Sequence, residues 1–508
     1  MGRVAVAAPS ALAAAAGAAV ADAGGNAVDA AIAATVFASI SEPGVCSLGA
    51  GGFITVTSAE GESVVYDGQV EMPGRGLGPE RFGKAMFEVS MAYGGGTTTL
   101  VGPGSVATPG SVAAFATVAN AHGQLPWPEL WEPSIIAATT GFPLPAASHR
   151  YLTQGAMDIF GRDDASREAV TGDDGMPLPA GATVFVKGLA DTLIQLAEEG
   201  PACLHGGDLG RRIADAVEAE GGILTIDDLS AYRVIHRTPL RVESAGWILS
   251  TVPPPAVGGA ALAAVLRIMG DSPDGTWEAP DVARFADALA AVFAYRAARI
   301  DRGESPEVAV NEMLGANNAQ DLAGMGAAST IHVSAVDSDG LACAATMSAG
   351  YGSGVLPAGS GVWLNNCLGE LELNRRGVHV LAPGTRLPSN MAPTVALDGN
   401  GRVMAVGTPG ADRITSAMAM VFLNITRLGL SLEDAIAHPR LHVEGWPEHP
   451  RAAYEPGLDV SEVTLPTRAF DEASMFFGGA AAALRHADGT LVAAADPRRT
   501  GGTAIAGE

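Results

Sequence analysis

The chain has 508 residues, of which 48% are hydrophobic, so it has ample material for a packed core and does not resemble a disordered protein. Asp and Glu outnumber Lys and Arg by 55 to 30, which gives a formal net charge of −25. A surface of this sign repels nucleic-acid phosphates and anionic lipids, so we expect no nucleic acid and no membrane as a partner.

The Ala-rich start of the chain is compatible with an export signal or with a folded segment. Pro9 interrupts the apolar run, Asp22 closes it, and Gly24-Gly25 is typical of a helix C-terminus. We therefore expect a strand, a turn and an Ala-rich helix, and not a signal peptide. The next apolar stretch, at 30–40, is too short to span a bilayer. These features predict a soluble cytoplasmic protein.

The chain up to residue 300 is predicted to be mainly helical. A hairpin that turns at Gly61 and a short strand at 245–252 interrupt the helices. The expected helices lie at 28–39, 111–142 (with a turn at 126–128), 187–235, 258–269 and 280–300.

The pattern changes near residue 329. Residues 305–329 are predicted to be irregular, and short strands dominate afterwards. The expected strands lie at 330–337, 341–348, 361–366, 394–397, 403–408 and within 482–495, with a last helix at 414–428. We expect one α/β globule with a seam in the chain, and not separate domains.

The four cysteines lie far apart in the sequence and form no CxxC pair. Such spacing favours buried free thiols over a disulfide framework or a zinc site. The spacing of His and carboxylate residues gives no metal site either. The glycine loop at 49–52 lacks the G-x-G-x-x-G spacing of a dinucleotide-binding fingerprint, so no nucleotide cofactor is expected.

Thr330 begins a strand whose alternation places His332 and Ser334 on the same face. If the chain were cut before Thr330, this residue would carry a hydroxyl and a free α-amine. An α-amine has a pKa of about 7.7–8.0 and can act as general base for its own hydroxyl. An ordinary strand Thr is the alternative at this point. Similarly, the turn at 407–413 is either a plain turn or a set of N–H groups that binds an oxyanion.

Several segments, taken together and in order, resemble the γ-glutamyltranspeptidase family of N-terminal-nucleophile hydrolases over nearly the whole chain. They are GGNAVDAAIAA at 24–34 with the following EPGVCSLGAGGF, VATPGSVAAF at 106–115, GGILTIDDLSAYRV at 221–234, PPPAVGG at 253–259, STIHVSAVDSDG at 329–340, LPSNMAPT at 387–394, GTPGADRI at 407–414 and ADPRR at 495–499.

The resemblance implies a four-layer αββα sandwich and a precursor that cuts itself between Ser329 and Thr330. Residues 1–329 would form a large subunit segment and residues 330–508 a small one, and the two would stay together. Thr330 would be the nucleophile, the N–H groups of Gly410 and Ala411 would form the oxyanion hole, and Ser348 would replace the family's second Thr. The family needs no metal or organic cofactor, and its partner is a small-molecule substrate.

The substrate pocket departs from the family. In the family's D-x-R motif an Arg binds the γ-glutamyl α-carboxylate, whereas Asp67-Gly68-Gln69 places Gln69 there. Losing such a bidentate charged pair weakens binding by several kcal/mol. The remaining predicted substrate-binding residues, which lie at rewritten positions or beside them, are Asn366, Cys367, Glu370, Ser389 and Asn390, and a family Asn becomes Gly350. We therefore expect a specificity other than glutathione.

Three functional hypotheses follow. The first is a self-processing amide or acyl hydrolase or transferase with an altered acyl specificity, or with a γ-glutamyl specificity that has survived drift. The second is a C–C bond hydrolase that releases an oxalyl-type group, as in related members of alkylproline antibiotic pathways of the lincosamide and pyrrolobenzodiazepine types. The third is a non-catalytic scaffold, against which the retention of Thr330, Ser348 and Gly410 argues.

Overall fold

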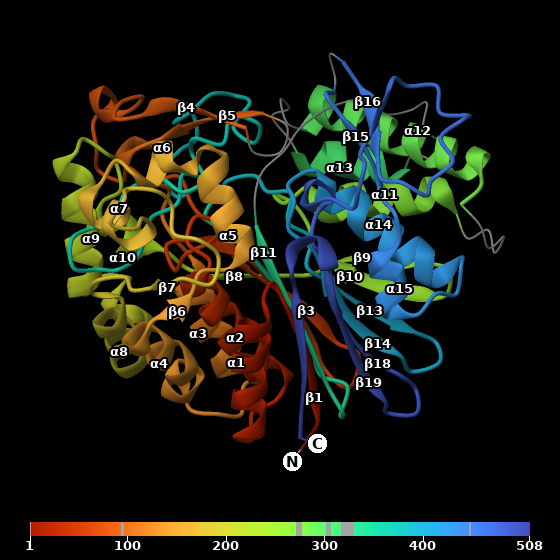
Figure 1. Ribbon diagram of the computed structural model, residues 1–508, viewed down its shortest axis with the longest axis horizontal. Helices are drawn as coiled ribbons and strands as arrows, with labels where there is room; N and C mark the ends of the chain where they lie inside the picture. Colours follow the sequence, from red (N-terminus) through yellow and green to blue (C-terminus); the bar gives the residue numbers. More distant parts are fainter. Residues whose placement is uncertain are drawn as a thin grey trace.

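The computed structural model describes residues 2–92, 96–270, 277–300, 306–315, 330–446 and 449–507. Two β-sheets lie face to face in the middle of the molecule, and helices cover the outer side of each sheet (Figure 1). The arrangement is the four-layer αββα sandwich that the sequence predicted. Both ends of the chain lie together at one end of the sheets (Figure 1).

The first sheet combines strands from the beginning and the end of the chain. Its order is β20-β1-β11-β12-β2-β3-β8, with antiparallel neighbours throughout. Every residue of β11 and β12 is buried, because both faces of these central strands are covered. The strands are β1 (Val4–Ala8), β2 (Gly51–Thr57), β3 (Ser63–Gly68), β8 (Ile235–Arg237), β11 (Ile331–Asp337), β12 (Ala342–Ser348) and β20 (Gly502–Ala506).

The second sheet packs on the first through small side chains. Ala5, Ala344, Ala405 and Ala483 belong to one buried cluster between the sheets. Their size lets the two layers approach closely, which gives the alanine content a structural purpose. The strand order is β19-β18-β14-β13-β10-β9. These strands are β9 (Leu240–Ser244), β10 (Trp247–Thr251), β13 (Thr394–Asp398), β14 (Val403–Gly407), β18 (Ala481–Arg485) and β19 (Leu491–Ala495).

The helices beside the first sheet include α2 (Ala27–Ser41), which is buried along its whole length and packs on β11 and β12. Asn26 and Asp29 form a capping box that satisfies its first N–H groups. The other helices of this half are α1 (Ala11–Asp22), α3 (Ser111–His122), α4 (Glu132–Thr140), α5 (Ala146–Tyr151), α6 (Met157–Phe160), α7 (Asp164–Val170), α8 (Leu189–Glu199), α9 (Asp208–Ala219) and α10 (Ile226–Ala231).

The helices beside the second sheet form the opposite outer layer, with a small sheet packed at its edge (Figure 1). They are α11 (Gly258–Met269), α12 (Ala279–Tyr295), α13 (Pro306–Gly315), α14 (Arg413–Thr426) and α15 (Leu432–Ala437). The small sheet contains β15 (Leu441–Glu444), β16 (Arg451–Tyr454) and β17 (Thr467–Ala469). Two further pairs are β4 (Phe87–Met91) with β5 (Thr97–Val101), and β6 (Phe142–Pro143) with β7 (Thr183–Val184).

Most predicted elements are confirmed, including the hairpin at Gly61 and the two strands predicted at 330–337 and 341–348. The strand predicted at 361–366 is wrong: only Leu364 forms an isolated bridge, with Gly49. The neighbouring Asn365 side-chain amide instead donates to the carbonyl oxygens of Gly49 and Ala107, at 2.8 and 2.9 Å. Polar side chains that bind backbone groups compete with strand pairing here.

The prediction of irregular structure at 305–329 is wrong for Pro306–Gly315, which forms α13, and residues 316–329 lie outside the described residues. Proline at the first helical position is favourable for a helix start, a signal that the prediction overlooked. Nor is the helix at 414–428 the last one, because α15 follows it, capped by the Ser431 side chain.

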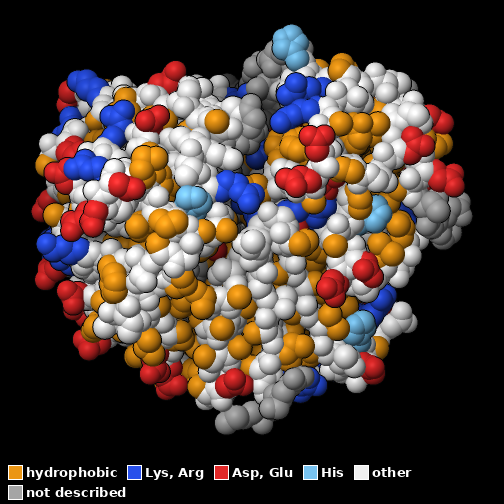
Figure 2. Space-filling view, in the orientation of Figure 1, with side chains coloured by type: hydrophobic (Ala, Val, Ile, Leu, Met, Phe, Trp, Pro, Cys, Tyr) orange, Lys and Arg blue, Asp and Glu red, His pale blue; other side chains and the backbone are white. Residues whose placement is uncertain are grey.

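No helix in the described parts of the chain is long and apolar enough to cross a membrane. The space-filling view shows Lys and Arg side chains mixed with Asp and Glu, without a continuous basic area on this face (Figure 2). A hollow lies in the upper middle of the same face, between the two helical halves of the molecule (Figure 2). In Figure 1 the start of β11 lies near it.

Candidate active site

Thr330 lies immediately before β11 and is buried, with 3% of its surface exposed. The pairing of β11 with β12 matches Ile331 with Met347, so the next position outward matches Thr330 with Ser348. Thr330 and Ser348 are distant in the sequence, and the antiparallel hairpin of β11 and β12 places them opposite one another. The hairpin brings the predicted nucleophile and the predicted second hydroxyl to the same edge of the site.

His332 follows on the same face as Thr330 and is held between the sheets. Its Nδ1 lies 2.7 Å from Thr346 Oγ1, and its Nε2 lies 2.8 Å from Ser334 Oγ. Burial lowers the pKa of His332 to about 3, so the ring is neutral at physiological pH. A Cβ at Gly407 would lie 2.3 Å from this ring, which explains a glycine in β14. His332 therefore packs and hydrogen-bonds between the sheets, and does not supply a catalytic proton.

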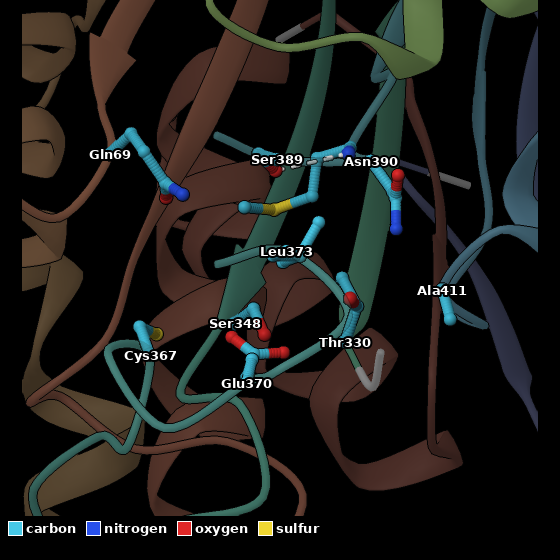
Figure 3. Close-up of a pocket in the computed structure, with 10 residues that line it drawn as sticks. Gln69, Thr330, Ser348, Cys367, Glu370, Leu373, Ser389, Asn390 and Ala411 are labelled. Carbon is cyan, nitrogen blue, oxygen red and sulfur yellow. Dashed lines mark hydrogen bonds between the residues drawn. The ribbon is translucent and has the colours of Figure 1, made fainter. Parts of the chain in front are cut away.

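A cavity of about 20 Å³ opens beside Thr330, and most of the predicted site residues meet there (Figure 3). In Figure 3 Gln69 and Cys367 lie on one side of it, and Thr330 and Ala411 on the other. Strands and loops far apart in the sequence thus converge on the predicted nucleophile. The lining residues are Gln69, Thr330, Ser348, Cys367, Glu370, Leu373, Ser389, Asn390, Met391 and Ala411.

Two predicted site residues do not line this cavity, and one lies outside the described residues. The Asn366 amide donates to Thr99 Oγ1 and to the Leu100 carbonyl, and its Oδ1 accepts the Tyr351 N–H at 2.7 Å. Asn366 therefore supports the cavity wall from behind. Gly410 lies next to Ala411 in the turn after β14. Ser329, on the other side of the predicted cleavage point, lies outside the described residues.

The turn at Gly410 and Ala411 has the left-handed backbone that favours glycine, with φ of +128° and +67°. For an alanine this conformation costs roughly 1–2 kcal/mol. Within the described chain, no backbone carbonyl accepts the N–H of either residue. The predicted oxyanion hole requires N–H groups without a backbone partner, and both residues meet this requirement although Ala411 stands where the family has a second glycine. We name residues 407–413 the oxyanion turn after this predicted role.

Hydrogen bonds hold the backbone of Gln69 on both sides, and its side chain lines the cavity. Its N–H donates to Asp67 Oδ1 at 2.9 Å, and its carbonyl accepts the Tyr232 hydroxyl at 2.7 Å. The Asp67 carboxylate is itself paired with Arg237 and Arg386, at 2.7 and 3.2 Å. The Asp of the D-x-R pattern thus keeps a structural role, while the side chain of Gln69 is the part that reaches the cavity (Figure 3).

Glu370 brings the only acidic side chain among the residues that line the cavity. Burial, and then the neighbouring carboxyl of Glu372, raise the pKa of Glu370 well above its usual value. Burial and Glu370 likewise raise the pKa of the Cys367 thiol. None of the described lining residues is Lys, Arg or His, so this part of the cavity wall carries no cation, and the raised pKa of Glu370 disfavours a negative charge there.

Gly350 and Glu370 have changed from the family pattern together. A Cβ at Gly350 would lie 2.3 Å from Asn366 Oδ1 and 3.1 Å from the Glu370 carboxyl carbon. The backbone of Gly350 also has a φ of +64°, which favours glycine. A side chain at this position would require Asn366 to shift and would press on Glu370, so this part of the pocket depends on glycine at 350.

Asn390 links the cavity to a buried cation. Its Oδ1 accepts a hydrogen bond from Arg296, which is 1% exposed and begins the short π-helical turn Arg296–Ile300 after α12. Burial by itself would raise the pKa of Asp412, but neighbouring groups, among them the positive charge of Arg296, together lower it below its usual value. Arg296 thus lies behind the cavity wall and not among the lining residues.

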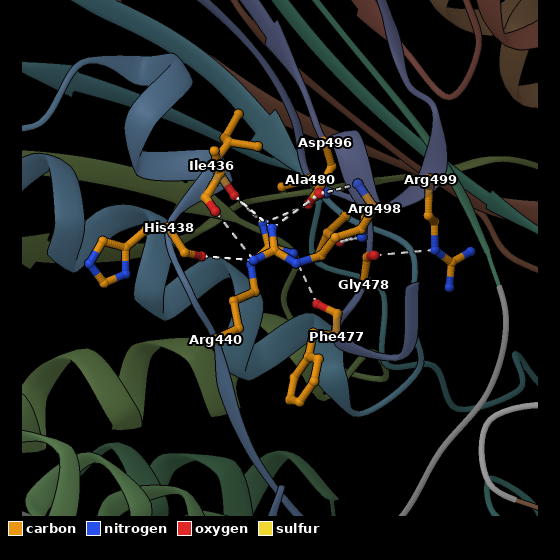
Figure 4. Close-up of polar contacts among 12 residues, drawn as sticks. Ile436, His438, Arg440, Phe477, Gly478, Ala480, Asp496, Arg498 and Arg499 are labelled. Carbon is orange, nitrogen blue, oxygen red and sulfur yellow. Dashed lines mark hydrogen bonds and ion pairs between the residues drawn. The ribbon is translucent and has the colours of Figure 1, made fainter. Parts of the chain in front are cut away.

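A buried ion-pair network positions the loop that supports the oxyanion turn (Figure 4). Asp496 pairs with Arg440 at 2.6 Å and with Arg498 at 3.2 Å. Arg499 donates to the Gly478 carbonyl at 3.3 Å. A Cβ at Gly410 would lie 3.0 Å from the Gly478 Cα, so the loop packs directly on the turn. The ADPRR motif therefore forms a clamp, because Arg499 binds the loop that packs against the oxyanion turn.

Sequence reasoning missed two lining residues: Leu373, which lies in none of the motifs, and Met391, which lies within LPSNMAPT at 387–394 but was not predicted to belong to the site. They are apolar residues of loops, and only the folded chain brings them to Thr330. Within the described residues, no group of three or more His, Cys, Asp or Glu side chains is arranged to hold a metal ion. All four cysteines are free and buried, as their spacing predicted.

Comparisons with known proteins agree with this geometry. The family model for gamma-glutamyltranspeptidase matches residues 13–506. The glutathione hydrolase proenzyme of Escherichia coli (strain K12) is 27% identical over 505 residues, which cover 92% of this chain and 85% of the relative. The acylase ACY 1 proenzyme of Pseudomonas sp. (strain SE83) is 30% identical over 442 residues, which cover 81% and 77%. The crystal structure of cephalosporin acylase from Bacillus halodurans has the same fold, with a TM-score of 0.79 at 23% identity and coverage of 100% and 96%.

Proposed function

The chain belongs to the γ-glutamyltranspeptidase family of hydrolases and acyltransferases, and we propose that it is a self-processing member whose nucleophile is Thr330. The observation that carries this proposal is the position of Thr330. It stands at the start of a central strand, opposite Ser348, and lines a cavity together with Ala411 of the oxyanion turn.

In this proposal the precursor cuts itself before Thr330. The new α-amine, with an ordinary pKa of about 7.7–8.0, takes the proton from the Thr330 hydroxyl as the oxygen attacks an acyl carbonyl. The N–H groups of Gly410 and Ala411 bind the negative oxygen that develops. Water or an amine then removes the acyl group from Thr330. The Ser348 hydroxyl orients the nucleophile from the neighbouring strand.

We further propose that the acyl group lacks a free amino-acid carboxylate. The support is the lack of a cation: Gln69 stands where the family has Arg, no described lining residue is Lys, Arg or His, and burial raises the pKa of the one acidic side chain among them, Glu370. A carboxylate in such a cavity would lose its hydration without gaining a charged partner, which is costly. That a relative is an acylase proenzyme supports a range of acyl donors in this family.

A C–C bond hydrolase that releases an oxalyl-type group is the second candidate, because an oxo-acid carbonyl suits the same nucleophile and oxyanion hole. Gln69 in place of an Arg supports a substrate other than a γ-glutamyl amide, but the carboxylate of an oxalyl group would meet the same lack of a charged partner, so this candidate ranks second. The two candidates differ in the bond that is broken, so amide and 2-oxo acid substrates distinguish them.

Thr330→Ala tests the nucleophile. We expect the purified parent to contain two fragments, 1–329 and 330–508, whereas the variant stays as one chain of about 51.2 kDa without activity. Intact-mass spectrometry measures the cleavage. Thr330→Ser, which keeps the hydroxyl, is the matched control and should still be cut. An intact parent chain that is fully active would contradict the proposal.

A further inference from the structure

A second cavity of about 20 Å³ touches Thr330. It is separate from the cavity that Gln69 and Glu370 line, which we call the acyl cavity after its proposed ligand. Among the residues that the structure describes, the two cavities share Thr330 and no other lining residue. Glu42, Tyr151, Ile331, Pro409 and Arg499 contribute to its wall. Its volume exceeds the roughly 10–15 Å³ that one water molecule needs. The nucleophile therefore lies between a substrate cavity and a water-sized cavity.

Glu42 is the unusual group in this second cavity. It follows the C-terminus of α2 and is only 3% exposed. Its carboxyl oxygen Oε1 is buried and has no hydrogen-bond partner in the part of the chain that the structure describes. An unsatisfied buried carboxyl is costly to maintain and calls for a functional explanation.

The surroundings of Glu42 suit proton exchange near neutral pH. Burial raises the pKa of Glu42 to about 7, although the positive charge of Arg499 opposes the shift. Burial also raises the pKa of Glu370, which lines the first cavity, and that of its neighbour Glu372 to about 7, so the comparison with Glu42→Gln decides which carboxyl gives a midpoint in this range. The remaining groups named here do not titrate in it. Burial raises the pKa of the Cys46 thiol to about 12, and the Tyr151 hydroxyl donates to the Tyr351 carbonyl at 2.9 Å. His332, on the strand that Thr330 begins, has a pKa of about 3.

We propose that Glu42 is the general acid–base residue of the self-cleavage step, acting on Thr330 through a water molecule in the second cavity. This proposal rests on the proposed self-processing function. Before cleavage Thr330 has no free amine, so its hydroxyl needs another base. A carboxyl buried beside it, with an oxygen left for water, supplies one.

The proposed chemistry has two balanced steps. The Thr330 oxygen bonds to the preceding carbonyl carbon, the C–N bond breaks, and Glu42 passes the hydroxyl proton to the departing nitrogen. An ester and a free amine result. Water then attacks the ester carbon and the bond to the Thr330 oxygen breaks, while Glu42 takes a proton from the water and returns it to that oxygen. A new carboxyl group and the free Thr330 hydroxyl are the products.

Glu42→Gln tests this role, because the amide has the same shape and cannot exchange the proton. Freshly translated full-length chains are incubated between pH 5.5 and 8.5, and fragment formation is followed on denaturing gels. The parent rate should rise with pH through a midpoint near 7, because the carboxylate is the active base. The variant should be cut at least tenfold more slowly and without that midpoint, since general acid–base catalysis contributes roughly 100-fold or more.

Glu129→Gln, at an exposed position, is the matched control and should behave as the parent. Thermal unfolding of each variant shows whether it has folded, and Glu42→Asp should restore part of the rate together with the midpoint. A Glu42→Gln chain cut at the parent rate, or a parent rate independent of pH, overturns the role of Glu42. A parent that is never cut at Thr330 instead overturns the proposed function itself.

Discussion

At the scale of single residues, Gln69 is the position on which the proposed acyl specificity depends most. The backbone around it keeps the geometry of the D-x-R pattern, because Asp67 still receives the Gln69 N–H and two arginines. What has changed is the charge at the tip of one side chain. An amide can hydrogen-bond to a carboxylate but cannot neutralise it, and in a buried site that difference amounts to roughly 2–5 kcal/mol.

Gln69→Arg should therefore restore affinity for a γ-glutamyl group. We expect the parent to hydrolyse a γ-glutamyl anilide poorly compared with anilides of uncharged acyl groups. The variant should raise kcat/KM for the γ-glutamyl anilide at least tenfold and lower it for the uncharged ones, as steady-state kinetics would measure. Gln124→Arg, on the exposed surface, controls for the added charge. Rapid hydrolysis of the γ-glutamyl anilide by the parent would refute the altered specificity.

Residue identities at the site were largely accessible from motifs, since Thr330, Ser348 and Ala411 all lie at the cavity that motif order predicted. Asn366 shows the limit of prediction from motifs, because it was expected to bind substrate and does not line the cavity. Adjacent residues in a loop point in different directions, so Cys367 lines the cavity whereas Asn366 binds backbone groups behind it. Glu42 and Arg499 both lie in motifs that the sequence displayed, but neither motif indicated a cavity beside Thr330.

At the scale of elements, the β11–β12 hairpin positions the proposed nucleophile Thr330 opposite Ser348. Strand alternation predicted β11 correctly, but the partner of Thr330 depends on the register, which the Ile331–Met347 pair defines. A slip of one residue would turn Ser348 to the other face of the sheet. Two wrong predictions belong to the same scale: at 361–366 the Asn365 amide binds backbone carbonyls in place of strand pairing, and at 306–315 Pro306 begins a helix.

Ser348→Ala should slow turnover roughly tenfold, the effect of losing one hydrogen bond near the reacting oxygen. Ser348→Thr, which restores the family's residue, should keep most of the activity. The rate per cleaved molecule is the quantity to measure, so that incomplete self-cleavage does not enter the comparison. Ser90→Ala, an exposed hydroxyl deletion on β4, is the matched control. Equal rates for Ser348→Ala and the parent would show that the register has no catalytic consequence.

At the scale of the whole molecule, the two parts of the chain on either side of Thr330 are interleaved. In the first sheet β11 and β12 lie between β1 and β2, and in the second sheet β10 pairs with β13. Cleavage before Thr330 would cut one covalent bond and leave these pairings intact. Separation of the fragments would require breaking both sheets and exposing the buried residues between them.

The cleaved protein should therefore elute as one species of the same size as the uncut Thr330→Ala chain. Size-exclusion chromatography in native buffer measures this. The fragments should separate only at denaturant concentrations that also unfold the protein, followed by circular dichroism in parallel. Elution of two separate fragments under native conditions would contradict the interleaved arrangement.

Ordered motifs and alternation within single strands were enough to predict the family, the general fold and Thr330 as the candidate nucleophile. The tertiary structure alone decided which groups surround Thr330. Glu42 follows α2, Arg499 belongs to a C-terminal clamp, and Gln69 follows β3, so their meeting depends on how two sheets and their helices pack. The protonation of Glu42 and Glu370 depends on the same packing, since burial sets the free energy of a charge.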